Sequence, residues 1–310
     1  MADKVKAAGI TPEEYAKIQL STLMDDEFMT EFFRDNIPAV QLVLRIIMSK
    51  DDLIVKRSRV QQFISGKKKY HSVRLDVYAV DSEGRQYDIE VQNASQGASP
   101  YRARYNSAII DVNTLKPREK YAVLRERENV VIFITKKDVL KGGLPIYTIQ
   151  RTITQTGKPF DDGTYIIYVN SSMQDTETDI GKLMHDFSCP DTGKMYYSRI
   201  ADDAEKLKKG ERIMGVWKNM KRAATAKGRA EGEAKGRAEG EAKGKAEGRA
   251  EGKAEGKAEG RAEGILVGIA QAYKNMAVDL LHLGTMTLEQ IADLCKMSLS
   301  QVQELAATIK

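Results

Sequence analysis

A tetrapeptide repeat in the second half of the chain limits what the protein can fold into. From Arg229 to Gly264, glycine occupies every fourth position, alanine precedes each glycine by two residues, and charged residues fill the remaining places. No side chain in this segment can contribute to a hydrophobic core. The segment is therefore a linker, a solvated helix, or both in turn, and any globular domain lies before or after it.

The order of charges within the repeat changes near Lys245. Before that point, oppositely charged residues lie four apart and would stabilise a helix, as Glu231 does with Lys235. After it, like charges lie four apart, and each glycine costs a helix about 1 kcal/mol relative to alanine. We therefore expect a marginal helix that frays toward its C-terminal half. Because nine basic and nine acidic residues cancel, a linker over residues 223–264 is favoured over a nucleic-acid-binding tract.

Charge and cysteine content limit the class of protein. The net charge is +5; the repeat is neutral and residues 265–310 carry −1, so residues 1–228 carry +6. This excess is compatible with a polyanionic partner. The N-terminus lacks the apolar core of a secretory signal, and no apolar run is long enough to span a bilayer. Cys189 and Cys295 have no paired-ligand spacing, so we expect a cytoplasmic protein without a membrane anchor, zinc site or disulfide framework.

The residues before the repeat carry the patterns of an α/β domain. Thr11-Pro12-Glu13-Glu14 begins a helix, with a capping Thr, Pro in the first turn and Glu three residues after the cap. Three further stretches are expected to be helical: 38–49, 100–128 and 178–220. Strands are predicted at 72–80, 86–93, 130–135, 147–154 and 164–169. This order predicts, over residues 1–222, a mixed sheet flanked by helices.

The residues after the repeat, 265–310, are expected to form a small helical unit. One amphipathic helix runs from Ile265 to Leu283 and is closed by Gly284, and Thr287 and Ser298 open two more with capping-box spacing. A shared apolar seam would be supplied by Ile291, Ala292, Leu294, Val302 and Leu305. The pattern resembles a helix-turn-helix. A helical hairpin that forms a homo-oligomer fits it at least as well.

The segment from Arg74 to Gln92 is the most informative about chemistry. Ser82-Glu83-Gly84 fits a three-residue hairpin loop with glycine in the left-handed position. If Asp81 faces Arg85, then Asp76 lies opposite Glu90, with Cβ atoms about 4.5–5.5 Å apart. Two carboxylates at this distance repel each other unless a cation lies between them, and a divalent ion fits that gap.

The strand period of two places Glu90 and Gln92 on one face of their strand. Phosphodiester hydrolysis needs a metal ion that polarises the phosphoryl group and lowers the pKa of a bound water. Asp76, Glu90 and the Val91 carbonyl can hold the ion, and Gln92 can orient the water, although an amide cannot act as a general base. On spacing alone, a hairpin whose polar side chains simply face solvent is the favoured interpretation.

A family resemblance reverses that preference. Asp76, followed fourteen positions later by Glu90-Val91-Gln92, resembles the Asp…Glu-x-Gln form of the PD-(D/E)xK signature. It is similar to the recombination-promoting nuclease and transposase family, Rpn. Two other segments resemble the family's Arg-Tyr-rich helix and its N-terminal Asp-x-x-Phe motif: Tyr101–Asp111 and Asp25–Phe28, with Met29 where a Lys is common. Strand 130–135 and the repeat also look like family features, so the resemblance covers nearly the whole chain.

The resemblance implies a PD-(D/E)xK nuclease fold, DNA as substrate, Mg²⁺ as cofactor and a link to recombination or transposition. It implies catalytic roles for Asp76, Glu90 and Gln92, and an accessory acid at Asp25. The commonest superfamily motif has Lys where Gln92 stands, so this chain departs from the pattern at that position.

The helix after the hairpin is a candidate for DNA contacts. Tyr101 and Tyr105 share a helix face, whereas Arg102 and Arg104 do not. Arg104 would bind phosphate beside the metal site, with Arg102 and Tyr105 as further candidates; a solvated Arg104 fits equally well. Other basic residues are given no firm role: Lys67-Lys68-Lys69, more readily a solvated loop than a phosphate contact, and His71, His185 and His282.

Three hypotheses about function follow. The first is a Mg²⁺-dependent DNA endonuclease that hydrolyses phosphodiester bonds. The second is a catalytically inactive DNA-binding protein on the same fold. The third is an oligomeric scaffold with the repeat as a spacer, which would span roughly 33 Å as a random coil and about 54 Å as a helix.

Overall fold

The computed structural model describes residues 9–64, 72–93, 95–209 and 212–309. The chain divides into two compact units, Met1–Ala226 and Lys227–Lys310, and the division falls within helix α9 (Ile213–Leu283). Each unit has a hydrophobic core of its own.

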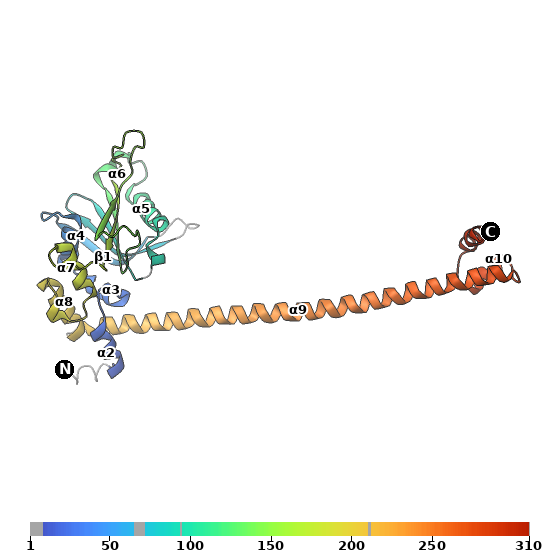
Figure 1. Ribbon diagram of the computed structural model, residues 1–310. Helices are drawn as coiled ribbons and strands as arrows, with labels where there is room; N and C mark the ends of the chain where they lie inside the picture. The colour runs from blue at the N-terminus through green and yellow to red at the C-terminus, as the bar shows by residue number, and fades with distance from the viewer. Residues whose placement is uncertain (1–8, 65–71, 94, 210–211, 310) are drawn as a thin grey trace. The chain divides into compact units, whose positions relative to one another are not determined.

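The first unit is built on a six-stranded mixed sheet with the order β1-β2-β3-β4-β6-β5 (Figure 1). Its strands are β1 (Val55–Ile64), β2 (Val73–Asp81), β3 (Gln86–Gln92), β4 (Asn129–Thr135), β5 (Ile146–Ile149) and β6 (Thr164–Asn170). β3, β4 and β6 run parallel, and the other neighbouring pairs are antiparallel. The prediction of an α/β fold with a mixed sheet is confirmed.

Helices cover both faces of this sheet. One face packs against α2 (Pro12–Leu20), α3 (Asp26–Phe33), α4 (Ile37–Met48), α7 (Asp179–Ser188) and α8 (Ser198–Lys209). The other face packs against α5 (Pro100–Thr114), whose Ile109 and Ile110 meet Val131 and Phe133 of β4. Figure 1 shows α4 and α5 on opposite sides of the strands. The short helices η1 (Ser95–Ala98), α6 (Ala122–Glu126) and η2 (Thr192–Lys194) lie in connections.

Local signals in the sequence explain several of these elements. Helix α2 begins with the predicted capping box, in which Thr11 and Glu14 exchange side-chain to backbone hydrogen bonds. Every residue of β4 is buried, because the strand has neighbours on both sides and helices on both faces. These predictions are confirmed to within one residue.

Three elements differ from the sequence-based expectation. Residues 56–64, the first part of a basic stretch, lie in strand β1, which the sequence did not predict. The helix expected over 100–128 ends at Thr114 and resumes as α6, since Pro117 lacks a backbone donor and disfavours helix at the residue before it. Strand β5 ends at Ile149, five residues before the predicted end.

The second unit consists of the later part of α9, α10 (Leu288–Leu294) and α11 (Leu299–Thr308). Both predicted capping boxes are present, at Thr287 and Ser298, and Gly284 has a φ of +67°. The predicted seam is buried at Ile291, Ala292 and Val302, but Leu294 is 51% exposed, so the prediction was wrong there.

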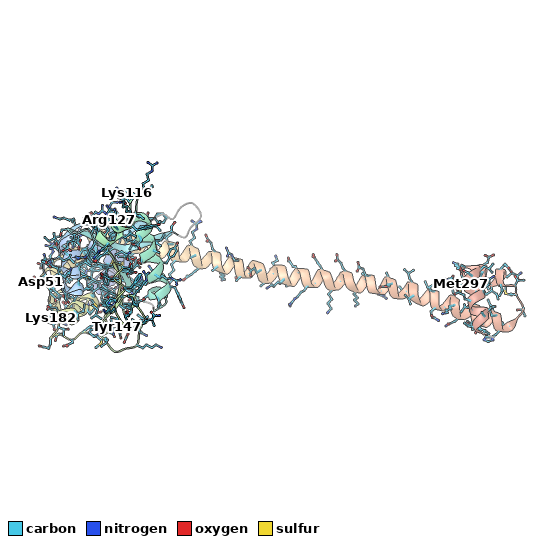
Figure 2. All side chains as sticks on the ribbon, turned by 90° about the horizontal axis from the view of Figure 1, so that it is seen from above. Asp51, Lys116, Arg127, Tyr147, Lys182 and Met297 are labelled. Atoms are coloured by element: carbon cyan, nitrogen blue, oxygen red, sulfur yellow. The ribbon has the colours of Figure 1, made fainter. Side chains whose placement is uncertain are left out.

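The repeat is helical throughout, whereas a helix that frays toward its C-terminal half was expected. Its side chains stand in solvent (Figure 2). Along the described part of the repeat, the last ion pair is Lys243–Glu247, at the point where the charge order changes. The pairs place the basic residue four positions before the acidic one, as Arg229 does with Glu233 at 2.9 Å.

Candidate active site

The loop of the β2–β3 hairpin sets the register of the two strands. Asp81 Oδ1 accepts hydrogen bonds from the backbone N–H groups of Glu83 and Arg85, each at 2.9 Å. Gly84 has a φ of +88°, the left-handed conformation that favours glycine. The Asp81 N–H donates to the Arg85 carbonyl at 3.1 Å, so the predicted pairing of these two residues is confirmed.

Asp76 lies where β2 separates from β3. The last pair of the ladder is Val77–Ile89, so the same register puts Asp76 opposite Glu90, one residue further on. In a continued ladder the Val91 N–H would bond to the β2 backbone. It donates instead to Asp76 Oδ2 at 3.2 Å, and Gln61 Nε2 of β1 donates to Asp76 Oδ1 at 3.5 Å. The separation of the strands thus directs this carboxylate toward the end of β3.

Glu90 is fully buried, and three polar side chains contact its carboxylate. Arg102 of α5 forms an ion pair with Oε2, and Gln92 Nε2 donates to the same oxygen at 3.2 Å. Asn106 Nδ2, one helical turn from Arg102, donates to Oε1 at 3.3 Å. The backbone of Asp76 is near enough to lower the pKa of Glu90. Glu90 and Asp76 therefore meet at one point, and α5 supplies the positive charge there.

Asp88 adds a third acidic group beside Glu90. It lies two residues earlier on β3 and is also fully buried. Its Oδ2 accepts a hydrogen bond from Asn106 Nδ2 at 2.9 Å. Its Oδ1 is buried without a hydrogen-bond partner among the described residues. An unpaired carboxylate oxygen is costly in such surroundings, so this atom marks a place where a cation or proton would be favourable.

The three carboxyl groups have raised pKa values. Burial is the largest cause at each, and the pKa is raised to about 7 for Asp76 and Asp88 and to about 8 for Glu90. Each acid also raises a neighbour's pKa: Glu90 that of Asp76, Asp88 that of Glu90, and Asp76 that of Asp88. Arg102 lowers all three. We refer to Asp76, Asp88 and Glu90 as the acid cluster.

Helix α3 brings Asp26, and not the predicted Asp25, to the acid cluster. Gln61 Nε2 lies 3.3 Å from Asp26 Oδ1 and 3.1 Å from Thr30 Oγ1, and it also reaches Asp76. Asp26 is a further cause of the raised pKa of Asp76. The Asp25 carboxylate turns away and accepts hydrogen bonds from the backbone and hydroxyl of Thr22. The expected accessory acid is thus displaced by one residue, because Asp25 is the N-cap residue of α3 with an extended backbone, whereas Asp26 is the first residue of the helix.

An open pocket of about 400 Å³ lies beside the cluster and is lined by Asp26, Gln61 and three arginines, Arg34, Arg74 and Arg222. Two buried polar atoms of its lining have no partner in the described part of the chain: Gln61 Oε1 and Asn219 Nδ2. Gln61 also has a φ of +50°, an uncommon backbone conformation for a residue with a side chain. The lining of this pocket thus holds one acceptor and one donor that a ligand could satisfy.

Gln92 depends on a glycine for its position. A Cβ atom on Gly97 would lie only 1.9 Å from Gln92 Oε1. The absence of a side chain at this position lets Gln92 extend beside η1 and donate to Glu90. Gln92 therefore stands on the Glu90 face of β3, as the strand period predicted.

The donor set suits a hard divalent cation, because carboxylate and carbonyl oxygens are its preferred ligands. Asp88 Oδ1, which no described residue contacts through a hydrogen bond, and the mutual repulsion of the acids also favour a cation. Within the described residues, however, no three His, Cys, Asp or Glu side chains are arranged to hold a metal ion. Glu90 is instead paired with Arg102. The residues thus fit Mg²⁺ in their chemistry, and an ion would need Glu90 to leave Arg102.

The predicted DNA-contact residues of α5 lie in two different surroundings, some beside the acid cluster and others in solvent. Arg102 reaches the acid cluster and also donates to the Gly97 carbonyl at 3.0 Å. Arg104 is exposed, and Tyr101 and Tyr105 are 75% and 38% exposed. The arginine beside the cluster is therefore Arg102, and not Arg104 as expected. The Lys67-Lys68-Lys69 run and His71 lie outside the described residues.

Sequence reasoning missed Asp88, Asn106, Asp26 and Gln61. Two of them had a usable signal: Asp88 shares a strand face with Glu90, and Asn106 follows Arg102 by one helical turn. Gln61 had none, because β1 was not recognised as a strand.

In comparisons with known proteins, no family model, curated protein or solved structure matches the chain. Across the described helices, none is both long enough and apolar enough to cross a membrane. The family resemblance of the hairpin motif accordingly stays a prediction.

Proposed function

We propose that this protein is a metal-dependent DNA endonuclease of the PD-(D/E)xK type. The observation that carries the proposal is the acid cluster: buried carboxyl groups with raised pKa values converge where two strands separate, beside an arginine-lined pocket. Strongly perturbed acids beside an open pocket are typical of catalytic sites. A role in recombination or transposition would be an extension of this activity.

Each residue of the site has a distinct task in this proposal. Asp76, Glu90 and the Val91 carbonyl would hold Mg²⁺. When bound, the ion polarises the phosphoryl group and lowers the pKa of a water molecule. Gln92 orients that water or a phosphate oxygen through its amide. It cannot remove a proton, so proton acceptance falls to a carboxylate whose raised pKa lies near neutrality, such as Asp88.

The arginines of the pocket bind the substrate backbone. Arg34, Arg74 and Arg222 line the same pocket as Asp26 and Gln61. Guanidinium groups bind phosphate oxygens with two parallel hydrogen bonds. They hold the strand beside the acid cluster, and Asn219 Nδ2, which has no partner in the described part of the chain, supplies another donor.

Cleavage of supercoiled plasmid with Mg²⁺ or EDTA tests the proposal. The expected result is nicking or linearisation that requires the ion and disappears in Asp76→Ala. Asp51→Ala is the matched control, since Asp51 is an exposed acid on the loop before β1 (Figure 2). Cleavage that survives Asp76→Ala, or a protein inactive with both Mg²⁺ and Mn²⁺, would refute the assignment.

A second candidate function is DNA binding without catalysis, and one observation favours it. Arg102 already supplies a counter-charge to Glu90, so the cluster is partly neutralised without a metal ion. Salt-dependent DNA binding without cleavage would support this alternative. The scaffold hypothesis rests on the second unit, where Ile265, Leu266 and Val267 are between 57% and 69% exposed.

A further inference from the structure

A groove separate from the acid cluster runs along β1 and α5. Two adjoining pockets of about 460 and 310 Å³ form it, and they share Arg57, Ile64, Tyr78 and Asn113. Among the described residues that line these pockets, none is acidic. We call this surface the β1 groove.

Basic residues line both pockets of the β1 groove. Arg57, which the two pockets share, and Arg59 are exposed on β1. Lys116 and Arg127 line the pocket of about 460 Å³, and Figure 2 shows them on the same side of the first unit. Arg127 is held in place by the Thr114 carbonyl at 3.1 Å and by Glu119 at 3.6 Å. A run of cations without lining acids favours an extended polyanion over an acidic side chain or a single ion.

Two aromatic rings accompany these cations. Phe63 on β1 is 60% exposed, although a phenylalanine on a strand is usually covered. Tyr78 lies in both pockets. Aromatic rings next to a basic groove are the means by which proteins bind single-stranded nucleic acid, since every base has a face that can stack. A duplex offers no free base face to Phe63.

The floor of the β1 groove is held by a chain of hydrogen bonds. The Tyr78 hydroxyl donates to Gln86 Oε1, and Gln86 Nε2 donates to Thr114 Oγ1 at 2.6 Å. Thr114 Oγ1 in turn donates to the Ile110 carbonyl at 2.7 Å. The ring of Tyr78 is thus fixed before a ligand arrives, which lowers the entropy lost on binding.

We propose that the β1 groove binds a single-stranded nucleic-acid segment, with Arg57 and Arg59 on its phosphates and Phe63 stacked on a base. From Arg57 to Phe63, β1 spans about 20 Å, enough for a segment of about four nucleotides. The proposal deepens the nuclease function by naming the form of nucleic acid that is held near the site. The groove is distinct from the acid cluster, because its floor residue Gln86 lies about 13 Å along β3 from Glu90.

Binding in EDTA tests the groove separately from cleavage. Fluorescence anisotropy with a labelled oligothymidine of about 15 nucleotides and a hairpin duplex of equal length compares the two forms. The full-length protein is expected to prefer the single strand. Phe63→Leu should weaken single-strand binding roughly 5-fold to 150-fold, whereas Phe63→Tyr, which keeps an aromatic face, should retain it.

Charge variants test the phosphate contacts. The paired substitution Arg57→Gln and Arg59→Gln should make the plot of log affinity against log salt shallower by about 1.4, because two contacts with a single strand are lost. Lys158→Gln is the matched control, since Lys158 is exposed in the connection before β6, at the opposite edge of the sheet. Equal loss in the control, unchanged binding by Phe63→Leu, or preference for duplex would overturn the proposal. Cleavage defects with normal groove binding would bear only on the acid cluster.

Discussion

Replacing Asp88 with Asn is expected to stabilise the metal-free protein, and more strongly as pH rises. Asp88 is fully buried, one of its oxygens has no hydrogen-bond partner among the described residues, and burial raises its pKa from 3.8 to about 7. Since the pKa of the folded state exceeds that of the unfolded state, folding favours the protonated carboxyl. That contribution to stability is complete below a pH of about 4 and is lost as pH rises through about 7.

The magnitude follows from the pKa difference. About three pKa units at 1.36 kcal/mol each give a penalty of about 4 kcal/mol at pH 8, and about 2 kcal/mol has been lost by pH 5. A neutral amide avoids this penalty. Its oxygen can keep the hydrogen bond from Asn106, and an uncharged amide loses less on burial than a carboxylate does. For a unit of this size, the gain corresponds to roughly 8–16 °C in Tm at pH 8.

Thermal unfolding in EDTA at pH 5 and pH 8 measures the effect. Asp186→Asn is the matched control because Asp186 is equally buried but accepts two backbone N–H bonds, from Tyr196 and Tyr197, each at 2.8 Å. This control should lose about 1–3 kcal/mol at both pH values. The reasoning is refuted if Asp88→Asn destabilises the protein at pH 8, or if its effect is the same at both pH values.

Three further predictions concern the site and the second unit. Gly97→Ala places a Cβ atom 1.9 Å from Gln92 Oε1 and so displaces the Gln92 side chain. We expect roughly tenfold slower plasmid cleavage with little change in Tm, and unchanged cleavage would argue against a role for Gln92. Arg102→Met removes the positive partner of the buried Glu90 and should cost about 3–5 kcal/mol of stability in EDTA. Its Tm should rise more on addition of Mg²⁺ than the Tm of the parent, and no response to Mg²⁺ in either protein would contradict the metal site. Deletion of residues 265–310 should lower the number of chains per particle in sedimentation, while cleavage per active site is kept. An unchanged number of chains would count against self-association.

Local signals made part of this structure predictable. The hairpin loop, the capping boxes and the apolar run of β4 each act within a few residues, and the structure places them as expected. The register of the hairpin then sufficed to bring Asp76 opposite Glu90. What lies within one hairpin can be worked out from sequence, because a turn fixes which residues face each other.

Contacts between distant segments could not be predicted in the same way. Strand β1 carries charged residues where a buried strand has apolar ones, since it forms an edge of the sheet. Without β1, nothing indicated that Gln61 links α3 to Asp76. The choice between Arg102 and Arg104 depends on the rotation of α5 over the sheet, which the packing of Ala103, Ile109 and Ile110 decides.

The exposed charges of β1 have a consequence for solubility. Outer strands offer unpaired backbone groups to other chains, and lysine or arginine on them discourages aggregation. The outer strand β5 is only four residues long, but β1 has ten and relies on Lys56, Arg57 and Arg59. Neutral residues there would invite intermolecular strand pairing as well as weaken any bond to phosphate. The same arginines would thus serve both solubility and the proposed binding of nucleic acid, whereas the exposed Phe63 would serve only the binding.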